Sequence, residues 1–221
     1  MPFDSLQIAQ SSGAAGPLGL LAASDGVAVH RWLGALAGNG EPIRDLADAA
    51  HYLCLLHATH PGVIDHAVLQ AATGIERDWL ESAAAAFAAE RDYLARIAAA
   101  AGPVPSTPGQ AECEAAAQQQ RHAMETLARS DRAGCATGAA LALALDWEAI
   151  RDLLDSGADR LDIAVPPRAL PRAEETATVI GTLIANGRIE RAMLFGAQQM
   201  FAQHRGLFDL LEARAGARGA I

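Results

Sequence analysis

The chain has 221 residues, a formal net charge of −9 at pH 7 and 51% hydrophobic residues, of which few are aromatic. This length is typical of one domain with a sizeable core. All 17 basic residues are arginines scattered among 26 acidic residues, so the sequence lacks the basic patch that binds nucleic acid or an anionic membrane surface.

Residues 1–41 are predicted to be a partly ordered N-terminal lead-in with one short helix, because they are rich in Ser, Gly and Ala and end in the break 38–42. The first residues lack the basic segment of a signal peptide. Three widely spaced cysteines, Cys54, Cys113 and Cys135, indicate reduced thiols rather than a disulfide framework. Both features predict a cytoplasmic protein. The longest apolar run ends at Asp146 and is too short to span a bilayer.

From residue 42 onward, apolar residues recur with the period of a helix between strong Gly and Pro breaks. The predicted helices are 42–60, 63–72, 75–101, 110–129, 133–155 and 172–214, the last interrupted near 186–187. The pattern predicts an all-α fold, an antiparallel up-and-down helical bundle of five to six helices that spans 42–214. Residues 215–221 are expected to fray.

Three histidines are predicted to point into the core. His57 and His60 fall in the apolar stripe of the helix 42–60, whereas Asp48 and His51 fall on its opposite, outward side. His204 lies on the apolar face of the last helix. A buried imidazole needs a partner. Converging imidazoles suit a metal, haem or proton-transfer site, but each histidine is also explained as a core residue bonded to a carbonyl or carboxylate.

Three further residues are candidates to support these histidines. Helical phase places Asp146 and Glu190 where a carboxylate would orient an imidazole, and Met200 in the apolar wall of the same centre. The polar row Glu114 to Arg129 on the helix 110–129 resembles a ligand row, but its spacing is also that of ordinary surface pairs, so we expect it to face water. No catalytic residue is identifiable.

The number and lengths of the helices resemble those of ferritin-like and haem-oxygenase-like bundles. Ferritin-like di-iron sites use Glu-x-x-His pairs, and the nearest match here is Asp48-Ala-Ala-His51. The segment Leu55-Leu56-His57, followed by His60-Pro61-Gly62 and Asp65-His66, resembles uncharacterised alphaproteobacterial all-α proteins. This resemblance implies no activity.

Two hypotheses of function follow, and whether the protein is an enzyme stays open. The first is a helical bundle with a histidine-lined internal pocket that binds a metal, haem or small ligand. The second is a non-catalytic interaction or regulatory protein that acts through helix packing. Alanine-rich stretches at 83–86 and 136–144 favour close helix approach, and we expect a homodimer.

Overall fold

The computed structural model describes residues 16–38, 40–185 and 187–219. Within these ranges the chain forms nine α-helices, one short 3-10 helix and no strand, which confirms the predicted all-α class. The helices are α2 (Pro17–Asp25), η1 (Val27–Val29), α3 (Arg31–Ala37), α4 (Ile43–His57), α5 (Val63–Gln70), α6 (Ile75–Ala101), α7 (Gln110–Ala128), α8 (Cys135–Arg160), α9 (Ala173–Ile184) and α10 (Gly187–Gly219).

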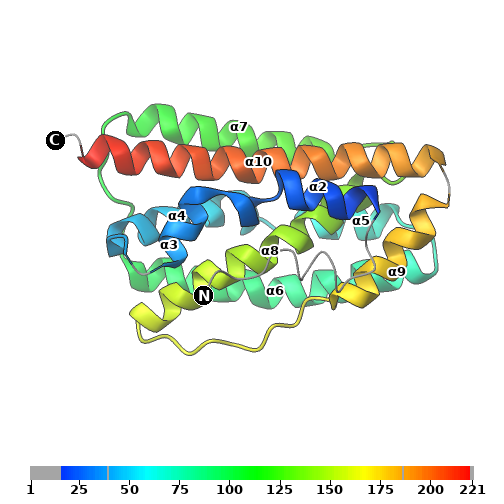
Figure 1. Cartoon of the computed structure of the whole chain (residues 1–221), viewed down its shortest axis with the longest axis horizontal. Coiled ribbons are helices and arrows are strands. Elements are labelled where there is room, and N and C mark those ends of the chain that lie inside the picture. The colour runs from blue at the N-terminus through cyan, green and yellow to red at the C-terminus, as the bar shows by residue number, and fades with distance from the viewer. Residues whose placement is uncertain (1–15, 39, 186, 220–221) are drawn as a thin grey trace.

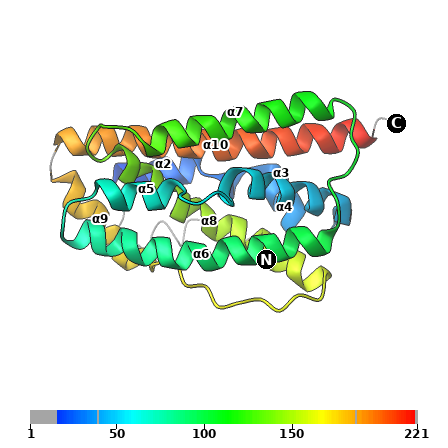
Figure 2. The same ribbon diagram turned by 180° about the vertical axis from the view of Figure 1, so that it is seen from behind.

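Helix α8 forms the centre of the bundle. Its first ten residues, 135–144, are all buried, because they are small or apolar and seven of the ten are alanine or leucine. Helices α6, α7 and α10 run along the length of the molecule around it, and α2, α3 and α9 cover the remaining sides (Figure 1 and Figure 2). In the described part of the chain no helix is both long enough and apolar enough to cross a bilayer.

The direction of the last long helix departs from a simple up-and-down bundle. Helices α4, α6, α7 and α8 alternate in direction, but α8 and α10 run the same way (Figure 1). Residues 161–172 form no regular helix, and an extended stretch of about 12 residues reaches about 40 Å. That matches the length of α8, about 39 Å for its 26 residues, so the coil returns the chain to the other end of the bundle.

Two glycines allow α8 and α10 to approach closely. A Cβ atom on Gly138 would lie 2.0 Å from the carbonyl oxygen of Met193, and one on Gly196 would lie 2.0 Å from that of Cys135. Any side chain at either position would therefore push the helices apart. The alanine face of α8, expected to mediate self-association, is used inside the monomer, and the homodimer stays a prediction.

Several helix ends differ from those expected. Helix α8 continues to Arg160 because Gly157 packs against Leu46, where a Cβ would come within 2.9 Å of that side chain, instead of ending the helix. Helix α10 extends to Gly219, through residues expected to fray. In the lead-in, Leu18 and Val27 are fully buried against the bundle, whereas residues 1–15 lie outside the described residues.

Candidate functional site: a buried histidine pair

Three side chains from three helices meet in the core. His57 is the last residue of α4, Asp146 lies in the middle of α8 and His204 lies in α10. Their exposed fractions are 4%, 3% and 0%, respectively. Because α10 packs closely on α8, His204 is held directly against Asp146.

Hydrogen bonds connect these groups in one line. The Nδ1 of His204 lies 2.7 Å from Oδ2 of Asp146, and the backbone N–H of Val27 donates to Oδ1 of the same carboxylate at 2.9 Å. On the other side of the ring, Nε2 of His204 lies 3.1 Å from Nε2 of His57. A carboxylate behind one imidazole thus fixes the orientation of the nitrogen that faces a second imidazole.

This geometry restricts where protons lie. A carboxylate accepts, so Nδ1 of His204 carries a proton that it donates to Asp146. Between the two Nε2 atoms one nitrogen donates and the other accepts. If His204 is neutral, His57 donates through its Nε2–H; if His204 is an imidazolium, it donates to a bare Nε2 of His57. The second arrangement requires a neutral His57, and in the first His57 is neutral unless its Nδ1 also carries a proton.

The surroundings of His57 reinforce its neutral form. Its ring makes edge-on contacts with Phe87, with a 6.1 Å centroid separation, and with Trp147, at 5.3 Å. Burial lowers the pKa of His57 well below 6.5, and the positive charges of His204 and then Arg91 lower it further. The imidazole therefore resists protonation in the folded protein.

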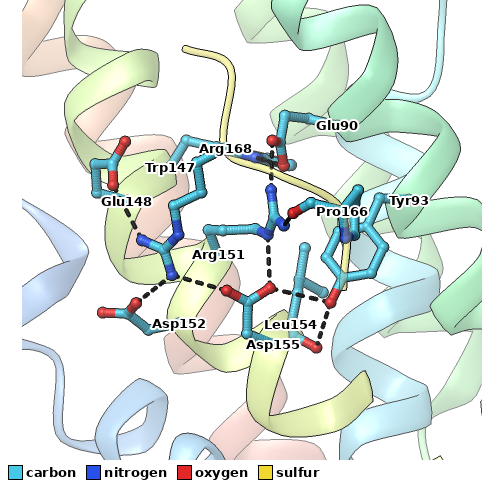
Figure 3. A network of polar contacts seen from close by, with 10 residues as sticks. All are labelled: Glu90, Tyr93, Trp147, Glu148, Arg151, Asp152, Leu154, Asp155, Pro166 and Arg168. Carbon is cyan, nitrogen blue, oxygen red and sulfur yellow. Dashed lines mark hydrogen bonds and ion pairs between the residues drawn. The ribbon is translucent and has the colours of Figure 1, made fainter. Parts of the chain in front are cut away.

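Trp147 connects the histidine pair to a second polar cluster, which Figure 3 shows. Its indole N–H donates to Glu90 at 3.0 Å, and Arg151 donates to the other oxygen of Glu90 at 2.6 Å. The same guanidinium also bonds to Asp155 and to the backbone oxygen of Pro166 in the returning coil. We call these residues, together with Arg168, the arginine network.

Arg168 and Tyr93 complete the arginine network. Arg168 extends from the coil to three carboxylates of α8, those of Glu148, Asp152 and Asp155. The Tyr93 hydroxyl donates to Asp155 at 3.0 Å. The network therefore fastens the coil 161–172 to α8 and α6 (Figure 3).

The structure brings together only some of the residues predicted for the site. His57, His204 and Asp146 meet, and Met200 is fully buried one turn before His204 on α10. His60 is not with them: α4 ends at His57, so His60 lies on the surface, with 69% of its side chain exposed, and contacts Asp65. Glu190 lies in the first turn of α10, 14 residues before His204 and half-buried.

A second prediction about α4 is also wrong. Asp48, expected on the outward face, is 1% exposed and forms a paired hydrogen bond with Arg214, both distances being 2.9 Å. Arg218 also bonds to Asp48 and to the neighbouring Asp45. Helical phase alone suggested an outward face because the partner arginines lie more than 160 residues away.

The polar row of α7, from Glu114 to Arg129, mostly faces solvent, as expected.

Two surface hollows lie away from the histidine pair. One small hollow is lined by residues of α4, α5 and α7, including His66 and Arg121, and a shallow one by residues of α2 and α10, including Phe195. Neither is lined by His57 or His204. In the described residues, no group of three or more His, Cys, Asp or Glu side chains is arranged to hold a metal ion.

Comparison with known proteins places the chain in a family without assigning an activity. No curated protein and no solved structure matches it. A sequence model of a family of unknown function, DUF6975, matches residues 22–219. The matched range runs from α2 to the end of α10 and includes both histidines of the pair and the whole arginine network. The chain therefore belongs to the family of unknown function DUF6975.

Proposed function

We propose that the protein is a non-catalytic regulatory protein that responds to acidification through the His57–His204 pair. The observation that carries this proposal is the 3.1 Å separation of the two Nε2 atoms inside the closed core. Such a pair shares one proton between its Nε2 atoms, and protonation of both rings would turn this hydrogen bond into two N–H groups that face each other. Histidine is the side chain that changes charge between pH 5 and 8.

The charges around the pair make the further proton costly. His204 from α10 and Arg91 from α6 both oppose a positive charge on His57. The carboxylate of Asp146, from α8, bonds to the far side of the His204 ring and so compensates charge on His204. Glu90, also on α6, is held by Arg151 and Trp147. A proton on His57 therefore gains no direct carboxylate partner in the described part of the chain.

The sign of the pH effect follows from the lowered pKa of His57. Above pH 6.5 the ring is neutral in both the folded and the unfolded chain, and the full stability is present. As the pH falls below 6.5, the unfolded chain takes up the proton first, and stability is lost until the lower pKa of the folded state is reached.

The output of this response is the packing of α4 on α10. The histidine pair joins the C-terminal end of α4 to the middle of α10. Loss of the hydrogen bond between the two histidines would loosen the packing of α4 on α10 and expose apolar faces of these helices that a partner can bind. Exposed apolar surface is the feature through which helical regulatory proteins engage other proteins.

Hydrogen exchange across a pH series tests the proposal. We expect amides near His57 and His204 to lose protection between pH 7 and 5, after correction for the intrinsic pH dependence of exchange. His57→Gln keeps a side-chain donor but does not titrate, so it should abolish this loss. His122→Gln, which removes a solvent-exposed histidine of α7, is the matched control and should behave as wild type. Equal loss in wild type and His57→Gln would contradict acid sensing.

The other hypothesis, a metal, haem or ligand pocket at the same histidines, requires space beside the rings. The aromatic contacts of His57 and the position of both hollows away from the pair argue against it. Elemental analysis and an absorption spectrum of purified protein distinguish the two. A stoichiometric metal or cofactor that is lost in His204→Ala would replace acid sensing with ligand binding.

A further inference from the structure

The shallow hollow between α2 and α10, which we call the groove, lies on the surface of the bundle. Helix α2 lies beside α10 (Figure 1). The groove has a volume of about 410 Å³, compared with about 30 Å³ for the other hollow, so it has room for side chains of a partner. It is lined by Leu21 from α2 and by Arg191, Leu194, Phe195 and Gln198 from α10. The four residues of α10 are spaced by three or four positions, so they share one face of the helix.

Large apolar side chains at the groove are exposed to solvent. The exposed fraction is 44% for Phe195 and 69% for Leu20, the residue before Leu21. Helix α2 has no polar residue from Pro17 to Ala23. One side of it packs on the bundle through the fully buried Leu18, and its outer side is therefore apolar as well. Neighbouring exposed apolar side chains on two helices mark an interaction surface.

Arginines form the rim of the groove. Arg132, from the loop between α7 and α8, lies over the Phe195 ring, with its guanidinium carbon 5.7 Å from the ring centroid. A stacked guanidinium still directs its N–H groups outward in its own plane, where they can donate to a carboxylate. Arg191 lines the groove itself, and Arg188 lies one turn before it on the same face of α10.

The rim arginines lack the carboxylate partners that most arginines of this protein have. Among the described residues, neither Arg132 nor Arg191 forms an ion pair, whereas most other arginines do. Asp131 and Glu190 are close to them in sequence but do not line the groove. The groove therefore has a positive rim although the chain as a whole has a net charge of −9.

We propose that the groove binds an acidic amphipathic helix of a partner protein. The apolar face of that helix covers Leu21 and Phe195, and its carboxylates accept hydrogen bonds from Arg191 and Arg132. A groove between two helices accepts the side-chain ridge of a third helix, which is a common mode of peptide recognition. Opposite charges at the rim then select an acidic partner.

Two other occupants fit the charges less well. A second copy of this chain, packed around a two-fold axis, would bring the rim arginines of both copies into one interface, where like charges repel. An anionic lipid surface would repel a protein of net charge −9 outside the groove. The inference goes beyond the acid response, because neither histidine of the pair lines the groove.

The test uses two fluorescent synthetic peptides and the full chain at pH 7. Each peptide is an amphipathic helix of about 18 residues, with leucines on one face and either glutamates or lysines on the other. Fluorescence anisotropy should show that the glutamate peptide binds with a Kd on the order of 10 µM, and the lysine peptide at least about tenfold more weakly. The net charge of the protein alone would favour the lysine peptide, so this order identifies the groove.

Two variants and two matched controls locate the binding site. Arg191→Glu should weaken binding of the glutamate peptide at least about tenfold and strengthen binding of the lysine peptide. Arg44→Glu makes the same charge change at an exposed position of α4 and should bind both peptides as wild type does. Phe195→Ala removes the aromatic anchor and should weaken binding about tenfold. Leu69→Ala removes an apolar side chain of α5 that is 74% exposed and should have no effect.

The proposal is overturned if the two peptides bind equally well, or if Arg191→Glu and Arg44→Glu give the same affinities. Light scattering that shows a dimer of wild type but a monomer of Phe195→Ala would assign the groove to a second copy. Sedimentation with phosphatidylglycerol vesicles that is lost in Arg191→Glu would assign it to a lipid surface. His57→Gln should bind the glutamate peptide as wild type does, so this test does not depend on acid sensing. Circular dichroism verifies that each variant is folded.

Discussion

Two polar clusters of the core meet at Trp147 and differ in how they carry charge. The histidine pair relies on a ring, His57, that must stay neutral, and burial holds its pKa well below 6.5. The arginine network relies on groups that stay charged. Although burial opposes it, hydrogen bonds from Arg151 and Arg168 keep the pKa of Asp155 below its usual 3.8. Burial and Asp155 raise that of Tyr93 to about 12.

The two clusters therefore stabilise the fold over different pH ranges. The contribution of Asp155 is present above pH 3.8 and is lost only as the pH falls below that value. The contribution that depends on His57 begins to fall at pH 6.5. Between about pH 4 and 6.5 the contribution of Asp155 therefore stays in place while the histidine pair weakens.

The largest expected effect is that of Arg151→Met. Removing this guanidinium leaves Glu90, which is only 3% exposed, without its 2.6 Å ion-pair partner. Breaking a buried pair from one side costs about 3–5 kcal/mol. Urea denaturation at pH 7 measures this loss as a fall in the free energy of unfolding. A fall smaller than that of Asp146→Asn in the histidine pair would contradict this ranking.

A smaller loss is expected from Asp146→Asn. The neutral amide removes the charged acceptor of the 2.7 Å bond to His204. Because a hydrogen bond to a charged group contributes about 1.5–3 kcal/mol, we expect a loss of that size in the free energy of unfolding. Asp152→Asn is the matched control on the same helix, because Asp152 is 61% exposed in its contact with Arg168. Urea denaturation should show a loss within about 1 kcal/mol for the control. Equal losses would mean that Asp146 does not orient His204.

The smallest effect is expected from Arg168→Gln. Its side chain is 40% exposed, and partly exposed ion pairs contribute at most about 1 kcal/mol. The loss should be confined to the coil 161–172, so limited proteolysis there should rise while the urea midpoint hardly changes. A large fall in that midpoint would show that the coil supports the whole bundle.

Local signals predicted most of the helices. Helix α6 lies between Gly74 and Gly102, both at positive φ, and has the bounds that its sequence predicted. Gly157 was expected to mark the end of the helix that became α8. It instead packs closely on Leu46, a contact that depends on another helix. The direction of α10 was also not predictable, because an irregular coil sets it.

The sequence predicted those site residues whose burial follows from their position on the helix face. His57, His204 and Asp146 share the core because each lies on the apolar side of its helix. His60 was misplaced because the helix was expected to end three residues later than it does. The pairing of Arg151 with Glu90 gave no sequence signal, since the two residues lie 61 positions apart and a charged residue in an apolar stripe looks like an edge residue.

The pH dependence of unfolding tests acid sensing by the histidine pair most directly. The free energy of unfolding of wild type and His57→Gln is measured by urea denaturation from pH 7.5 to 5. Wild type should lose stability below pH 6.5, with a slope approaching about 1.4 kcal/mol per pH unit from the single proton, and His57→Gln should lack that part of the slope. Parallel curves for the two proteins would contradict the account.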